Sequence, residues 1–288
     1  MNPYVILTDS GCDIIPETLA QWGVKYITLT FRFSDEDREY ANDEMSASDF
    51  YARMRQGGIA KTSAINSERF REFFESELKA GNDVLYLGFS SGLSATYNTA
   101  RMAAEQLTAE YPERTIITID TLAASAGQGM LVAFAARAKE AGKSLQETAD
   151  TVRSYIPRLC HWFTVDDLVY LKRGGRISPT VAFVGNMLGI KPVLHVDDDG
   201  HLINMFKVRG RRASIAALAK KFGELLENAD CNEAFISHGD CVEDAEELKR
   251  IVEAHYGANV TLITSVGTVI GAHSGPGTLA LFYIGNQR

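Results

Sequence analysis

The stretch FTVDDLVYLKRGGRISPTVAFVGNMLGIKPVLHVDDDGHLINMFKVRGRR, residues 163–212, places basic residues beside a long apolar segment. Arg176 follows two glycines, so it can extend from a loop and bind a carboxylate or phosphate with its planar guanidinium group. Ser178 and Pro179 then predict the start of a helix reading VAFVGNMLGI, which is apolar on nearly every face. We interpret this helix either as buried core or as the wall of a tunnel for an acyl chain. A second basic cluster contains Lys207, Arg209, Arg211 and Arg212. Together these features indicate a ligand with an anionic head and an apolar tail.

The composition is that of an ordinary globular protein, with 45% hydrophobic and 23% charged residues. A length of 288 residues exceeds the usual limit for one hydrophobic core, which favours two domains or one large α/β domain. The formal net charge of -8 disfavours nonspecific binding to nucleic acid or to an anionic membrane, although a local basic patch can still bind an anion. We therefore expect no nucleic-acid partner.

The cysteines and the N-terminus indicate the compartment. No C-x-x-C spacing occurs among Cys12, Cys160, Cys231 and Cys241, so we expect reduced thiols rather than a zinc site or disulfides. The N-terminus, MNPYVILTDSGCDIIPE, lacks a basic segment followed by an apolar one. No later run reaches the roughly 18 apolar residues that a membrane span needs. We expect a cytoplasmic protein with no integral membrane segment.

The first half alternates strands with helices. Strands are expected at residues 4–8, 24–30, 83–87 and 114–120, and helices at 46–56, 67–79, 94–111, 123–141 and 144–155. This alternation is typical of βαβ crossovers and a parallel sheet. It predicts a three-layer α/β/α domain.

The second half changes character near Pro157. Strands are expected at residues 159–165, 191–196, 202–208, 233–238, 260–264 and 279–284, and helices at 213–228 and 242–255. An Asp-Gly-His sequence predicts a hairpin between the second and third of these strands. The pattern predicts a two-layer α/β domain with a mixed sheet, and domains of 1–157 and 158–288.

Two hydroxyl-rich loops are candidates for binding an anion. In KTSAINSERF, residues 61–70, Thr62 and Ser63 precede a helix whose expected N-cap is Ser67, and plain capping is the alternative to a carboxylate or phosphate site. LGFSSGLSATYNTA, residues 87–100, places Ser91 and Ser94 at a strand-to-helix turn, where N–H groups of the helix point outward. The second loop is therefore the stronger candidate.

The same loop also permits an enzyme. Gly88 to Gly92 matches G-x-S-x-G, the nucleophile elbow of serine hydrolases, with Ser90 as the nucleophile. Asp240 and His273 follow in the chain order that such a triad needs. A serine esterase or thioesterase is therefore the alternative to a binding protein. His273 itself is expected in a glycine-rich turn, where it either faces a cleft or has a structural role.

Several separate motifs resemble the DegV family of bacterial fatty-acid-binding proteins, from TDSGCDI to GTLALFYIG. They are TSAINS, SSGLSATY, VDDLVYLKRGGRIS followed by IKPVLHVDDDG, KVRGRR and IGAHSGPG. The resemblance implies two α/β domains with one long-chain fatty acid between them and no cofactor. Its carboxylate would be held by Thr62 and Ser94, beside Ser63 and Ser91. Arg176, Arg209 and His273 would serve acyl-phosphate handling and partner docking.

The resemblance also implies a partner and no catalysis by the chain itself. In some bacteria a fatty acid kinase phosphorylates the fatty acid that such a protein presents. We therefore expect a fatty-acid carrier that takes part in lipid transport. The chain departs from the family pattern at Ala64-Ile65-Asn66, where Gln-Pro-Ser is usual, and at Ala95, where glycine is common. These departures affect the backbone of both loops and leave both hydroxyls in place.

Overall fold

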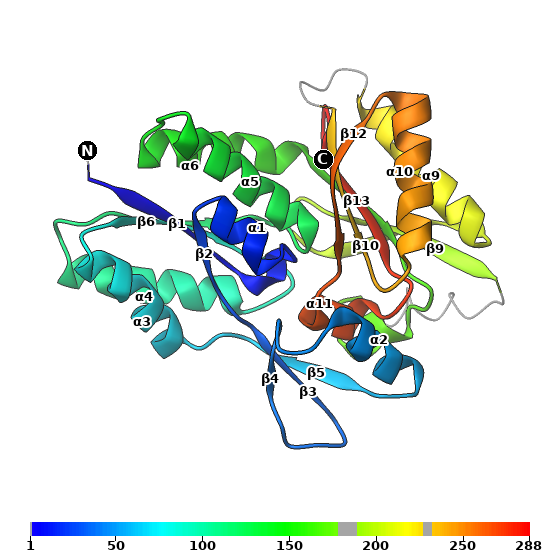
Figure 1. The fold of residues 1–288 in the computed structure, drawn as a ribbon, viewed down its shortest axis with the longest axis horizontal. Coiled ribbons are helices and arrows are strands. Elements are labelled where there is room, and N and C mark those ends of the chain that lie inside the picture. Colours follow the sequence, from blue (N-terminus) through cyan, green and yellow to red (C-terminus); the bar gives the residue numbers. More distant parts are fainter. Residues whose placement is uncertain (1, 178–188, 227–231) are drawn as a thin grey trace.

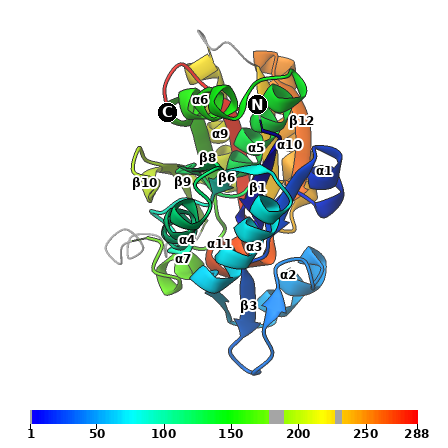
Figure 2. The ribbon, with the colours of Figure 1, turned by 90° about the vertical axis from the view of Figure 1, so that its left-hand side faces the viewer.

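The computed structural model describes residues 2–177, 189–226 and 232–288, and within them it contains three sheets (Figure 1). The expected helix at VAFVGNMLGI, together with its predicted start at Ser178 and Pro179, and Cys231 lie outside these residues. Two larger sheets, one from each half of the chain, form the body of the molecule. A third, smaller sheet lies below the first (Figures 1 and 2).

The first sheet is parallel throughout, as the alternating pattern predicted. Its order is β2 (Val24–Ile27), β1 (Tyr4–Asp9), β6 (Asp83–Gly88) and β7 (Ile116–Asp120). One face carries α3 (Ser67–Lys79) and α4 (Thr96–Glu110), and the other carries α5 (Ala126–Glu140) and α6 (Leu145–Tyr155) (Figure 1). The three-layer α/β/α prediction is confirmed.

The second sheet is mixed. Its order is β10 (Leu202–Arg209), β9 (Ile190–Val196), β8 (Leu159–Thr164), β13 (Leu279–Ile284), β11 (Glu233–His238) and β12 (Asn259–Ser265). Only β11 and β12 pair in parallel; the other pairs are antiparallel. On one face lie α9 (Arg211–Leu226) and α10 (Val242–Tyr256) (Figure 1). The predicted hairpin joins β9 to β10, where Asp197 N–H donates to the His201 carbonyl.

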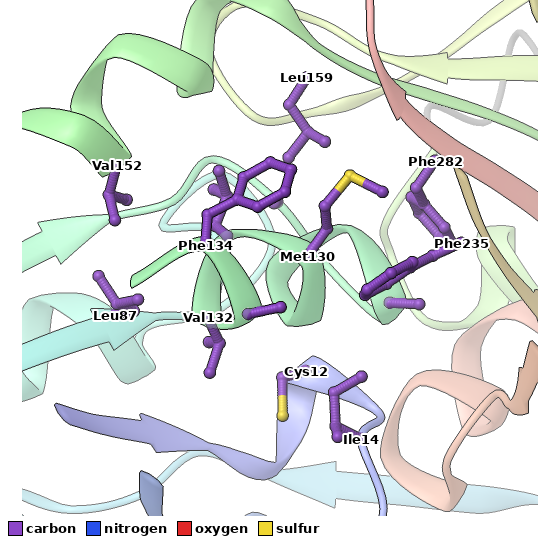
Figure 3. Close-up of a cluster of buried hydrophobic side chains, with 14 of the residues drawn as sticks. Cys12, Ile14, Leu87, Met130, Val132, Phe134, Val152, Leu159, Phe235 and Phe282 are labelled. Carbon is purple, nitrogen blue, oxygen red and sulfur yellow. The ribbon is translucent and has the colours of Figure 1, made fainter. Parts of the chain in front are cut away.

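Helix α5 packs between the two large sheets. Its residues are buried on nearly every face, which is the pattern of a helix enclosed by other elements. Met130 and Phe134 of α5 share one hydrophobic core with Leu87 of β6, Phe235 of β11 and Phe282 of β13 (Figure 3). The two halves of the chain are therefore joined by continuous apolar packing.

The third sheet was not predicted. Its order is β4 (Tyr40–Ala41), β3 (Thr30–Phe33) and β5 (Ala60–Ser63), all antiparallel. The single strand expected at residues 24–30 is wrong, because the chain divides there into β2 and β3. Helices α2 (Ala47–Arg55) and α11 (Thr268–Ser274) cover this sheet, and α7 (Val169–Arg173) contacts α11.

Smaller elements complete the fold. They are α1 (Pro16–Gln21) and the 3-10 helices η1 (Ser10–Cys12) and η2 (Ile156–Arg158). Two local predictions are wrong. Asn66, not Ser67, caps α3, because its side-chain oxygen accepts the Arg69 N–H at 2.9 Å. His273 lies in the helix α11 rather than in a turn. Of the helices in the described residues, none is long and apolar enough to cross a membrane.

Candidate functional site

A cavity of about 320 Å³ lies between the two halves of the chain. This volume is at the lower end of the range for small-molecule sites, about 300 to 1,000 Å³. One side of its wall comes from β5 and from loops that follow β6 and β7, and the other side comes from β8, β13 and their neighbours. Most of the wall is apolar, with Phe89, Leu93, Phe163, Val196, Val269 and Phe282 among its residues. Four polar side chains gather where the loops meet α11: Thr62, Ser94, Arg176 and His273.

Thr62 and His273 form a hydrogen-bonded pair in this wall. Thr62 lies in β5, opposite Phe31 of β3, and its Oγ1 is 2.8 Å from Nε2 of His273. Burial lowers the pKa of His273 to about 4, and the Arg176 cation acts in the same direction. The imidazole is therefore neutral near pH 7, with one nitrogen as donor and the other as acceptor.

The loop after α7 packs directly against the histidine ring. Nδ1 of His273 has no hydrogen-bond partner among the described residues. A Cβ atom added to Gly174 would lie 2.1 Å from that nitrogen, so only glycine allows this approach. The GGR sequence therefore has two structural roles: Gly174 leaves room for the ring of His273, and Gly175 provides the turn with a φ of 71°.

Arg176 connects this loop to the loop after β6. Its Nε donates to the Leu93 carbonyl at 3.1 Å, and its Nη1 donates to the Gly174 carbonyl. The side chain is half-buried, and desolvation lowers its pKa from the ordinary arginine value. Since an arginine pKa is very high to begin with, the group remains a cation. It provides a fixed positive charge in the wall of a mostly apolar cavity.

The loop after β6 places Ser94 in the wall, beside Arg176. Ser94 Oγ is 2.8 Å from Thr96 Oγ1 and accepts the Thr96 N–H at 3.2 Å. Ser63 also lines the cavity, on an exposed part of its wall. Ser91 is not among the lining residues, and its N–H instead donates to Asp120 at 3.2 Å.

The residues of the alternative hydrolase triad do not form a triad. Ser90 is fully buried, does not line the cavity, and its hydroxyl donates to the Gly200 carbonyl at 2.9 Å. Asp240 pairs with Arg55, and the hydrogen bond of His273 goes to Thr62. Among the residues that the structure describes, Ser90 therefore has no base that would activate it as a nucleophile.

The second basic cluster lies outside the cavity. Arg209 is the exposed last residue of β10. Arg211 is engaged by two carboxylates, Asp244 at 2.8 Å and Asp166 at 3.7 Å. The structure thus separates Arg176, which lines the cavity, from Arg209 at the surface.

Five further polar residues of the described chain line the cavity and were not predicted: Ser125, His161, Ser237, Ser274 and Thr278. Ser125 follows β7, the neighbour of β6 in the parallel sheet. Because loops after neighbouring parallel strands meet at one sheet edge, the TLAAS segment at residues 121–125 could have been grouped with the SSGLS loop. His161 and Ser237 carry no local signal, since each is one polar residue in an apolar strand.

Comparison with known proteins identifies the family. The family model described as "Uncharacterised protein, DegV family" matches residues 3–286. The chain belongs to the DegV family. A DegV domain-containing protein of Clostridium perfringens is 42% identical over 291 residues, which cover 100% of this chain and 99% of the relative.

Solved structures of fatty-acid-binding proteins share the fold over nearly the whole chain. A fatty-acid-binding DegV family protein from Thermus thermophilus has a TM-score of 0.88 at 28% identity, covering 98% of this chain and 99% of that chain. A stearic-acid-binding protein from Eubacterium ventriosum has a TM-score of 0.87 at 26% identity, covering 98% of each chain. The predicted fold class, with a parallel sheet and a mixed sheet, is that of fatty-acid-binding DegV structures.

Proposed function

We propose that this chain binds one long-chain fatty acid in the cavity, with its carboxylate at Thr62 and Ser94. The observation that carries this proposal is an apolar cavity whose wall places two hydroxyl groups, a neutral histidine and a half-buried arginine together. Burial of an acyl chain contributes about 0.8 kcal/mol per methylene. The fatty acids bound by structural neighbours from Thermus thermophilus and Eubacterium ventriosum support the same ligand class.

The pairing of Thr62 with His273 suits a carboxylate. In the tautomer protonated on Nε2, the imidazole donates to Thr62 Oγ1, and the threonine proton is then free to point at the ligand. Ser94 Oγ can donate in the same way, because the Thr96 N–H and hydroxyl are both donors that it can accept from. Arg176 balances the ligand charge, which lowers the unfavourable effect of burying an anion.

The second part of the proposal is that the bound carboxylate is presented to a fatty acid kinase for acyl-phosphate formation. Arg209 is exposed outside the cavity, so it is available to a phosphate or to an acidic partner. Catalysis would then belong to the kinase. The absence of a hydrogen-bonded Ser90 triad in the described residues supports a carrier rather than a hydrolase.

Two further features belong to this proposal. We place the protein in the cytoplasm, where a soluble kinase would meet it. We also divide the chain into domains of 1–157 and 158–288. The strands of the parallel sheet all precede residue 121 and those of the mixed sheet all follow residue 158, which supports this boundary.

Native mass spectrometry tests the binding step. Protein purified from a bacterial host should carry about one fatty acid per chain, and delipidated protein should take up added stearate or palmitate. Mass spectrometry of an organic extract would identify the acyl chain. Protein that is purified without lipid and takes up neither fatty acid would contradict the carrier function.

A further inference from the structure

The cavity has polar groups at a second place, away from Thr62 and Arg176. Its wall follows the chain from Thr278, just before β13, to Phe282 of β13, a distance of about 13 Å at roughly 3.3 Å per residue. Ser237 of β11 lies opposite Ala280, and His161 of β8 lies opposite Phe282. Ser125, His161 and Ser237, which we name the inner polar group, therefore line the cavity on both sides of β13, in the part that an acyl tail would enter.

His161 has no visible partner in this wall. It is 1% exposed, and within the described part of the chain neither ring nitrogen forms a hydrogen bond of good geometry; the ring has a weaker polar contact with the Leu159 backbone. Its side chain is on the same face of β8 as Phe163, and both line the cavity. The ring packs edge-on against Phe282, and a Cβ on Gly127 would lie 2.7 Å from its Nε2.

A buried imidazole without partners is unfavourable unless a ligand or a water molecule satisfies it. Burial lowers the pKa of His161 well below its ordinary value, so the ring is neutral. A neutral ring offers one N–H donor and one acceptor nitrogen. This donor and this acceptor match a ligand group that can both donate and accept a hydrogen bond, such as a hydroxyl.

The two serines extend this hydrogen-bonding capacity. Ser125 Oγ is 2.5 Å from Asp13 Oδ2 and 2.9 Å from Ser237 Oγ. Ser125 has a single hydroxyl proton, so it donates either to Ser237 or to Asp13; when it donates to Asp13, Ser237 can donate to Ser125. Ser237 Oγ then keeps free lone pairs for a ligand donor. The backbone also holds Ser125 in place, with a φ of 55° and its N–H bonded to the Gly11 carbonyl at 2.8 Å.

We propose that the inner polar group binds a hydroxyl group carried on the acyl chain, so that the preferred ligands are long-chain hydroxy fatty acids; this rests on the proposed fatty-acid binding. A second carboxylate fits less well, because this part of the cavity disfavours negative charge: burial raises the pKa of Asp13, which is hydrogen-bonded to Ser125, to about 7, and His161 carries no charge to balance an anion. The chemistry therefore favours a neutral oxygen over a dicarboxylic acid.

Competition binding to delipidated protein tests this inference with four ligands: stearate and its 2-, 10- and 12-hydroxy derivatives. One added neutral hydrogen bond should make the 10- or the 12-hydroxy acid bind about 3- to 10-fold more tightly than stearate. The 2-hydroxy acid carries its hydroxyl next to the carboxylate, so it should show no such gain.

Two variants locate the effect. His161→Phe keeps an aromatic ring, and Ser237→Ala keeps a small side chain; each should reduce the preference towards equality while stearate still binds. Ser274→Ala is the matched control, because Ser274 also lines the cavity with a buried, unpartnered hydroxyl but follows His273 directly. It should leave the preference unchanged.

The outcomes separate this inference from the proposed function. Tight binding of stearate with no preference for either mid-chain hydroxy acid would overturn the inference and leave fatty-acid binding intact. A preference that survives in both His161→Phe and Ser237→Ala would overturn it as well. Failure of all four ligands to bind would instead contradict the proposed function.

Discussion

Thr62 Oγ1 lies 2.8 Å from Nε2 of His273, although the two residues are 211 positions apart in the chain. The contact joins β5, which belongs to the small sheet, to α11, which leads into the central strand β13. It therefore fixes one candidate carboxylate ligand relative to the apolar wall of the cavity. A shift of α11 would therefore also move Thr62 relative to a ligand that contacts it.

Substitution of the two hydroxyl residues should weaken binding of the fatty acid. Thr62→Val and Ser94→Ala each remove one donor to a buried carboxylate, which should reduce the binding free energy by about 1.5 to 3 kcal/mol. Titration of delipidated protein with a fluorescent fatty acid measures this loss. Ser90→Ala is the control, because Ser90 is hydrogen-bonded to Gly200 and lies outside the cavity wall.

Ser90→Ala should lower stability by about 1 kcal/mol, through loss of a buried hydrogen bond, with little change in affinity. Labelling of Ser90 by a fluorophosphonate probe, or an esterase activity lost in Ser90→Ala, would instead support the hydrolase.

Protonation of His273 should make the protein less stable in acid. Its pKa is about 4 in the folded protein, compared with 6.5 in the unfolded chain. Between these two values the unfolded chain binds more protons, so stability falls as the pH falls from about 6.5 to 4. His273→Gln removes this term. The difference in unfolding free energy between wild type and His273→Gln should therefore change by roughly 2 to 3 kcal/mol between pH 7 and pH 4.5.

Urea denaturation of both proteins across that pH range measures the change, and the shared histidines His161 and His195 cancel in the difference. A difference in unfolding free energy that stays constant with pH would show that the pKa of His273 is not lowered in the folded protein.

Gly174 should tolerate no side chain. The Cβ of Gly174→Ala would lie 2.1 Å from Nδ1 of His273, so the ring must move and its contact with Thr62 must break or weaken. Overpacking of this kind costs about 1 to 3 kcal/mol in stability. The imidazole NMR signals of His273 should shift, and affinity for the fatty acid should fall.

Gly175→Ala is the matched control in the same loop. Gly175 has a φ of 71°, and no atom of the described residues lies within 4 Å of an added Cβ, so its substitution introduces backbone strain. We expect a loss of about 1 to 2 kcal/mol in stability and unchanged signals from His273. Equal shifts of those signals in both variants would contradict a steric role for Gly174.

The two large sheets could be predicted from sequence because their strands and helices have clear periodicity. The small sheet could not, since β3 and β5 have four residues each and β4 has two. Their stability depends on α2 and α11, and α11 comes from the other end of the chain. Separation along the chain also explains the wrong prediction for His273. Its glycine-rich neighbourhood predicts a turn, but in the structure this segment packs against β5 as the helix α11.

The candidate site likewise has a part that could be predicted from the sequence and a part that could not. Thr62, Ser94 and Arg176 lie in segments with distinctive local sequences, and the structure brings them into one cavity wall. The inner polar group could not be predicted, because Ser125 and Ser237 are 112 positions apart and meet only when α5 packs on the mixed sheet. A single polar residue in an apolar strand can be recognised as a candidate ligand only when the cavity that it faces is known.

Arg209 provides the cleanest test of the kinase proposal. Arg176 lines the cavity, so its substitution would disturb ligand and partner together, whereas Arg209 is exposed and does not line the cavity. Arg209→Ala should leave the amount of bound fatty acid unchanged and reduce acyl-phosphate formation by a bacterial fatty acid kinase about 10-fold, which corresponds to about 1.4 kcal/mol. Added salt should slow the wild-type reaction, because surface charges are screened. Arg153→Ala, an exposed arginine on α6, is the charge-matched control and should react like wild type. An Arg209→Ala protein that is purified without lipid, or that supports full kinase turnover, would show that Arg209 has a different role.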